Sequence, residues 1–272
     1  FLNDKRVIDI PWLLRKILVN LLIVPFRAPK SAKIYKDVWT EKGSPIIYHT
    51  HDLCEKLKNV LGSDYHVEYA MRYKNPSLKK TLESWEGKNF KQIIILPLFP
   101  HYASATNGSV IEEAMDVMKK WWVIPELSFV SQFYNEEFYL KGFEEKGNAH
   151  DFKEYDHILF SFHGLPERHV DKVYKDGLCK DNDCEHGIND ENVFCYKATC
   201  YETAIQLAKR FKLKEEDYTV GFQSRLGRGW IEPFSDEIIT DLAKKGAKKL
   251  LVFSPAFVAD CLETIIEIGD EY

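Results

Sequence analysis

The sequence lacks an apolar run long enough to cross a membrane. A membrane-spanning helix needs about 20 consecutive apolar residues, and the most apolar segment, residues 11–26, is interrupted by Arg15, Lys16 and Asn20. The opening residues also lack the charged start, apolar centre and small-residue cleavage site of a secretory signal peptide. We therefore expect a cytoplasmic protein. Residues 11–26 can form a core helix or an amphipathic surface that touches a membrane, and the sequence alone favours the core.

Excess positive charge is missing as well. The formal net charge is −5 over 272 residues, whereas general nucleic-acid binding needs a basic face. The sequence contains no internal repeat, low-complexity run or Gly/Ser linker. With 45% hydrophobic and 29% charged residues, it has the composition of a globular protein of one large or two medium domains.

Cysteines are few and unevenly placed. Of the six, four lie close together: Cys179, Cys184, Cys195 and Cys200. In a large chain of cytosolic type, such clustering favours metal binding over a disulfide framework. The spacing C-x4-C-x10-C-x4-C is compatible with zinc or with an iron–sulfur cluster, because both can be held by four thiolates.

Short apolar runs alternate with helix-like segments along the chain. The runs span 66–73, 91–99, 126–133, 157–162, 218–224 and 249–257, and helical periodicity spans 109–121, 200–211 and 235–245. This alternation predicts an α/β fold with parallel sheets, in which ligands bind at the carboxyl ends of the strands. Runs 93–99 (IIILPLF) and 157–162 (HILFSF) are apolar almost throughout, which predicts strands covered on both faces. Ser109, with Glu112 three residues later, predicts a capping box.

Four loops after predicted strands contain most of the residues suited to chemistry. They are LPLFPHYASATNGS (96–109), SFHGLPERH (161–169), QSRLGRGWIEP (223–233) and SPAFVADCLETIIEI (254–268). With RVIDIP (6–11), FRAPKSAKIY (26–35) and GSPI (43–46), they occur in the order typical of ferrochelatases. The sequence resembles that family, which inserts ferrous iron into a porphyrin at the end of haem synthesis, over nearly its whole length.

The resemblance implies two similar Rossmann-like (flavodoxin-like) halves with parallel sheets and a cleft between them. We expect an N-terminal half, residues 1–131, that carries a porphyrin-binding lip. The C-terminal half, residues 132–272, is expected to carry the catalytic residues and the cysteine cluster. Family members usually begin upstream of Phe1 and continue beyond Tyr272, so we expect the chain to be trimmed at both ends.

Metal insertion needs a base and a weak metal ligand. Two pyrrole protons must leave the porphyrin, and an imidazole has the appropriate pKa to accept them. Carboxylate and imidazole also hold Fe²⁺ loosely enough to release it. The resemblance implies that His163 is the proton acceptor and faces the metal, with Glu263 as the carboxylate opposite. Taken singly, a satisfied core histidine and an acid at a helix start are the alternatives.

Six cations and no acid lie between Trp12 and Lys36, which is typical of an anion-attracting segment or of a solvated basic face. The resemblance implies that the porphyrin propionates bind at Arg27, Lys30, Tyr35 and Ser44. It implies that the pocket is lined by Arg72, Tyr102 and Trp230, since aromatic rings pack well on a flat macrocycle. Residues 12–26 would form an apolar lip at the mouth of the cleft. This lip would give the protein a peripheral contact with a membrane.

The resemblance also implies a [2Fe–2S] cluster on Cys179, Cys184, Cys195 and Cys200, with zinc as the alternative and Fe²⁺ as substrate. The expected substrate is protoporphyrin IX or coproporphyrin III, the expected partners include no nucleic acid, and the protein is a monomer or homodimer. Two other functions stay open. One is a cobalt or nickel chelatase of another tetrapyrrole; the other is a non-catalytic haem or metal carrier, which needs no base paired with a carboxylate.

Overall fold

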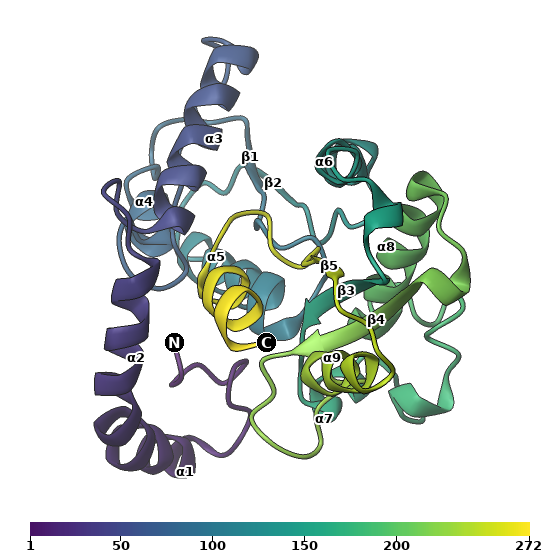
Figure 1. The fold of residues 1–272 in the computed structure, drawn as a ribbon. Coiled ribbons are helices and arrows are strands. Elements are labelled where there is room, and N and C mark those ends of the chain that lie inside the picture. The colour runs from purple at the N-terminus through teal and green to yellow at the C-terminus, as the bar shows by residue number, and fades with distance from the viewer. The chain divides into compact units, whose positions relative to one another are not determined.

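The chain divides into two compact α/β units. The computed structural model describes residues 1–272. Unit 1 consists of residues 1–97, 104–131 and 259–262, and unit 2 consists of residues 98–103, 132–258 and 263–272. Each unit contains a parallel sheet with helices (Figure 1). The predicted α/β class with parallel sheets is therefore confirmed.

Unit 1 combines a long helical N-terminal region with a small sheet. Its elements are α1 (Trp12–Ile17), the π-helix η1 (Leu18–Ile23), α2 (Val24–Val38), α3 (Pro45–Leu61), α4 (Leu78–Glu83), β1 (Gln92–Ile95), the π-helical turn η2 (Ser104–Gly108), α5 (Ser109–Met118) and β2 (Glu126–Phe129). Strands β1 and β2 pair in parallel. Helices α4 and α5 pack together around a core that includes Leu82, Ile93, Ala114 and Met118.

Unit 2 is built around the central strand β3. Its elements are α6 (Glu137–Gly147), η3 (Phe152–Glu154), β3 (His157–His163), α7 (Glu167–Asp171), η4 (Cys179–Asp181), α8 (Tyr196–Phe211), η5 (Glu215–Asp217), β4 (Tyr218–Gln223), α9 (Ser235–Lys244), β5 (Leu250–Phe253) and the π-helix η6 (Glu263–Glu271). The three strands are parallel in the order β4-β3-β5 (Figure 1). The five inner residues of β3 are buried, as predicted for a strand covered on both faces.

Two strand predictions in unit 1 are wrong. Residues 66–73 form no strand, because Met71 uses its backbone groups in a local turn. Its N–H donates to the Pro76 carbonyl at 2.7 Å, and its carbonyl accepts from the Leu78 N–H at 3.0 Å. Strand β1 is not covered on both faces either, since Ile94 is 55% exposed.

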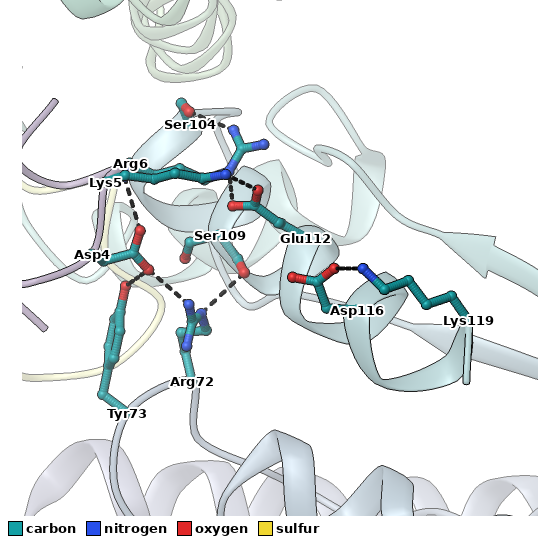
Figure 2. A network of polar contacts seen from close by, with 10 residues as sticks. All are labelled: Asp4, Lys5, Arg6, Arg72, Tyr73, Ser104, Ser109, Glu112, Asp116 and Lys119. Atoms are coloured by element: carbon teal, nitrogen blue, oxygen red, sulfur yellow. Dashed lines mark hydrogen bonds and ion pairs between the residues drawn. The ribbon is translucent and has the colours of Figure 1, made fainter. Parts of the chain in front are cut away.

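The predicted capping box at the start of α5 is also wrong. Ser109 is already inside the helix, and its hydroxyl donates to the Thr106 carbonyl at 2.9 Å. Glu112 turns away and forms ion pairs with Lys5 and Arg6, both at 2.6 Å. Figure 2 shows these long-range contacts, which replace the local motif.

Residues 11–26 are helical but do not form a core. Large apolar side chains along this segment are solvent-exposed. Trp12 is 64% exposed and Phe26 is 77% exposed. Only Arg15 and Val19 are buried there, so the core interpretation is wrong. None of the helices in the structure combines the length and hydropathy that a membrane span requires.

Candidate active site

His163 ends β3 with a defined tautomer. Its Nδ1 lies 2.6 Å from the main-chain oxygen of Gly164. A carbonyl oxygen can only accept a hydrogen bond, so Nδ1 carries the proton and Nε2 keeps its lone pair. The side chain is half-buried. The end of the central strand therefore presents an imidazole nitrogen that can accept a proton or bind a metal ion.

The residue after His163 must be small, because two strand ends approach closely there. The Gly164 N–H donates to the Gln223 carbonyl at 2.7 Å. A Cβ on Gly164 would lie 2.7 Å from that oxygen and 3.3 Å from the indole of Trp230. Trp230 is held in this place by a backbone bridge to Pro166. Two predicted site residues, His163 and Trp230, are thus brought together in unit 2.

Gln223 connects the end of β3 to the start of η6. It pairs with His163 in the sheet register and is only 1% exposed. Its amide donates to the main-chain oxygen of Glu263 and to the Glu267 carboxylate, both at 3.1 Å. Its side-chain oxygen accepts from the Ser161 hydroxyl at 2.9 Å. The predicted base and the predicted carboxylate residue are therefore linked through one buried residue, by its backbone on one side and its side-chain amide on the other.

Glu267 fastens η6 to the end of β4. The carboxylate accepts from the Ser224 N–H at 2.6 Å, from the Ser224 hydroxyl and from the Tyr272 hydroxyl at 2.8 Å. Glu263, in the first turn of the same π-helix, is half-buried. Sequence reasoning missed Gln223 and Glu267; the available signal was a polar residue at the end of the apolar run 218–222.

A buried polar cluster in the same unit surrounds His101. This residue is fully buried, and burial lowers its pKa to about 3, so the ring is neutral. Because Thr203 donates to the Thr199 carbonyl, its oxygen accepts from His101 Nε2 at 2.9 Å. The ring packs against Phe162, whose centroid is 5.3 Å away. His101 lies in the loop 96–109 but is not among the predicted site residues, and its contacts are structural.

Three of the four clustered cysteines come together. The Sγ atoms of Cys179, Cys184 and Cys195 lie 3.6–3.8 Å from one another. A tetrahedral ion with metal–sulfur bonds of about 2.3 Å holds its sulfurs about 3.8 Å apart, so these thiols match three corners of such a site. The Tyr174 hydroxyl lies 3.1 Å from the Cys184 sulfur. Cys200 is buried but is not part of this group.

The helical geometry of α8 explains the position of Cys200. It follows Cys195 by five residues, which corresponds to about 140° around a helix. Its thiol instead lies beside Tyr196, where burial first, and the charge and hydrogen bonding of Cys200 second, raise the pKa of the phenol. A fourth thiolate ligand from Cys200 therefore requires a rearrangement at the start of α8.

Shared protons hold the three thiols together. Hydrogen bonds from Cys179 and Cys184 lower the pKa of Cys195 well below its ordinary value. Those with Cys184 and Cys195 raise the pKa of Cys179. A metal ion would replace the shared protons, since cysteine binds metals as the thiolate. The residues present therefore fit a metal centre.

The predicted propionate residues of unit 1 lie on and after α2. Arg27, Lys30 and Tyr35 are in the helix and largely exposed, and Ser44 directly precedes α3. Arg15, from the same cationic segment, is buried and donates to two backbone carbonyls. The cations of the segment thus differ: Arg27 and Lys30 face solvent, while Arg15 has a structural role.

Arg72 is already paired within unit 1. Its Nε donates to the Ser109 carbonyl at 3.0 Å, one terminal nitrogen donates to Asp4 at 2.7 Å, and the other pairs with Glu113. Figure 2 shows the contacts with Asp4 and Ser109. The guanidinium also lies over the Tyr73 ring at 4.5 Å. Asp4 and Glu113 neutralise the charge of Arg72. If Arg72 lines a pocket, it would therefore contribute packing contacts rather than a free positive charge.

Tyr102 is half-buried in unit 2. Its ring meets the ring of Phe194 edge-on, with centroids 5.5 Å apart. Phe194 directly precedes Cys195, so the predicted pocket residue contacts the cysteine-rich segment.

Comparisons with known proteins agree over the whole chain. The family model described as Ferrochelatase matches residues 1–272. A protein of Legionella pneumophila (strain Corby) is 46% identical over 270 residues, covering 99% of this chain and 80% of that protein. A protein of Coxiella burnetii (strain Dugway 5J108-111) is 41% identical over 276 residues, covering 99% and 76%. Both are named ferrochelatase.

Proposed function

The chain belongs to the ferrochelatase family, and on that premise we propose how its own residues carry out metal insertion. The predicted family and enzyme class are confirmed: the protein is a lyase that inserts Fe²⁺ into a porphyrin to form haem. We propose that His163 Nε2 accepts the pyrrole protons one after the other and passes them to solvent. Glu263 is the carboxylate that receives Fe²⁺ and balances the charge of the imidazolium.

The tautomer of His163 is the observation that supports this proposal. Because Nδ1 is engaged with the Gly164 carbonyl at 2.6 Å, the nitrogen with the lone pair is the other one. A base must hold its lone pair ready at the reacting atom. Gln223, bonded to the backbone of both Gly164 and Glu263, keeps the base and the carboxylate residue on one rigid support.

Substrate binding is proposed for the side chains that the resemblance to ferrochelatases identifies. We propose that Arg27, Lys30, Tyr35 and Ser44 bind the propionates of protoporphyrin IX or coproporphyrin III, and that Arg72, Tyr102 and Trp230 line the pocket. The exposed apolar residues of 12–26, such as Trp12 and Phe26, favour contact with a membrane surface, where an apolar substrate is found.

We propose that the cysteine segment holds a metal centre that orders the protein around it. The resemblance to ferrochelatases favours a [2Fe–2S] cluster, with zinc as the alternative. Cys179, Cys184 and Cys195 would be ligands in either case, and a cluster would recruit Cys200 as the fourth thiolate. Such a centre contributes local folding energy, because its ligands are brought together only when the segment folds.

An anaerobic assay of Fe²⁺ insertion, run in parallel with protoporphyrin IX and coproporphyrin III, tests the proposal. His163→Ala should abolish insertion while porphyrin binding is retained. His157→Ala is the matched control, since it lies at the opposite end of the same strand and bonds only to Thr219, at 2.8 Å. Turnover by His163→Ala would show that another group is the base. Preference for Co²⁺ or Ni²⁺ with another tetrapyrrole, or binding without insertion, would favour the alternative functions.

A further inference from the structure

Cys195 lies between two aromatic residues that each contact the proposed active site. On one side, the ring of Phe194 meets the ring of Tyr102 at 5.5 Å. On the other, the hydroxyl of Tyr196 donates to the main-chain oxygen of His163 at 2.9 Å. Cys195, a member of the cysteine group, is thus the direct chain neighbour of one residue that contacts the proposed base and of another that contacts a proposed pocket residue.

Tyr196 holds one side of the peptide that carries the base. The His163–Gly164 peptide has its oxygen bonded to the Tyr196 hydroxyl and its N–H bonded to the Gln223 carbonyl at 2.7 Å. Because a peptide unit is planar, these two bonds fix its orientation. The Gly164 carbonyl that follows accepts from His163 Nδ1. The direction of the imidazole therefore depends on how this peptide is held.

Few residues of the cysteine-rich segment are buried. Between residues 171 and 194, the only buried residues are Cys179, Cys184 and Asn192. The segment is tied to α7 by the Cys179 N–H, which donates to Asp171 at 2.9 Å. A long polar segment with so small a core needs a ligand to keep one conformation.

We propose that the metal centre on Cys179, Cys184 and Cys195 positions His163 through Tyr196. Metal binding holds Cys195, Cys195 holds the first residue of α8, and the Tyr196 hydroxyl holds the His163–Gly164 peptide. Tyr196 is a positioning residue that does not touch the substrate. The inference rests on the proposed function in two respects, namely that His163 is the base and that the cysteine segment holds a metal centre.

Hydrogen exchange measured by mass spectrometry tests this coupling on the full chain. The protein purified anaerobically, with its metal content determined, is compared with the same protein stripped by a chelator. Removing the metal should speed exchange of the backbone amides of residues 163–165 about tenfold, the effect expected when a buried hydrogen bond is lost. If the protein is isolated without metal, it is loaded with Zn²⁺, or with iron and sulfide, before the comparison.

Two tyrosine variants separate positioning from general stability. Tyr196→Phe removes the bond to His163, and Tyr139→Phe, the control, removes a buried hydroxyl that donates to the Pro255 carbonyl at 2.5 Å in the same unit. Tyr196→Phe should keep its metal yet exchange at residues 163–165 like the stripped wild type. Its kcat should fall about tenfold with little change in the porphyrin KM. Tyr139→Phe should keep the metal-dependent protection.

Several results would overturn the inference. They are native protection at residues 163–165 in metal-loaded Tyr196→Phe, equal exchange in loaded and stripped wild type, and failure to bind zinc or iron with sulfide. Turnover by His163→Ala refutes only the assigned base, and the exchange data then still decide whether the metal centre controls this peptide.

Discussion

Replacing Gly164 with alanine tests the close approach of β3 and β4 beside the candidate base. The added Cβ would lie 2.7 Å from the Gln223 oxygen and 3.3 Å from Trp230, and neither a buried backbone oxygen nor a packed indole can yield cheaply. Overpacking of this kind costs about 1–3 kcal/mol. Separating the strands would also weaken the 2.7 Å bond between Gly164 and Gln223, at about 1 kcal/mol. We expect Gly164→Ala to lower the free energy of unfolding by about 2–4 kcal/mol.

Urea unfolding at fixed metal content measures this loss, and Gly142→Ala provides the matched control. Gly142 lies within α6, where an added Cβ would meet no other atom within 4 Å, and the variant is expected to gain about 0.5–1 kcal/mol from the better helix former. Iron insertion by Gly164→Ala should fall even where the protein is folded, because the peptide carrying His163 is displaced. Native stability and turnover in Gly164→Ala would refute the argument that this contact positions the base.

Four further variants test other parts of the structure. His101→Gln should reduce the loss of stability in acid. Burial lowers the pKa of His101 from 6.5 to about 3, so the free energy of unfolding is unaffected by this residue above pH 6.5 and declines by about 1.4 kcal/mol per pH unit as the pH falls towards 3. Urea unfolding across this range would detect the difference. Glu263→Gln should reduce turnover at least about 100-fold with little change in unfolding; full activity would leave Glu263 only a role in starting η6. Replacing Arg27 and Lys30 with alanine should raise the porphyrin KM more than the iron KM, and an effect limited to iron would contradict propionate binding. Cys184→Ser should lose bound metal and expose residues 172–194 to proteolysis, whereas undiminished metal content would remove Cys184 from the ligands.

Local pattern was sufficient for the fold class and for β3, whose inner residues are buried, but it did not distinguish β3 from β1, where Ile94 is 55% exposed. It was insufficient for residues 66–73, since the turn that engages Met71 depends on how Pro76 and Leu78 fold back. The geometry of the candidate site also depends on long-range contacts. The hydrogen bond from the Gln223 amide to the main-chain oxygen of Glu263 could not be predicted from the sequence. The cysteine spacing identified the cluster but did not show that α8 turns Cys200 away from the other three.

The residues of the site were named from motifs, and their roles in catalysis stay predictions. The structure adds the contacts that surround these residues, which a motif does not contain. His163 and Trp230 meet through Gly164, whereas the guanidinium of Arg72 is paired with acids of its own unit. Electrostatic pairing of this kind cannot be read from one position, because Asp4 and Glu113 are distant from Arg72 in the chain.

The strand order β4-β3-β5 has a consequence for the newly made chain. During synthesis, β3 emerges first, yet both of its neighbours come from later residues, 218–223 and 250–253. Until they are made, an apolar strand has two unpaired edges, a form that readily associates with other chains. The last partner, η6, follows at residues 263–271 and completes the contacts around Gln223. A ribosome-bound chain that stops before these residues therefore lacks the contacts that η6 makes with Gln223 and Ser224 at the end of β4.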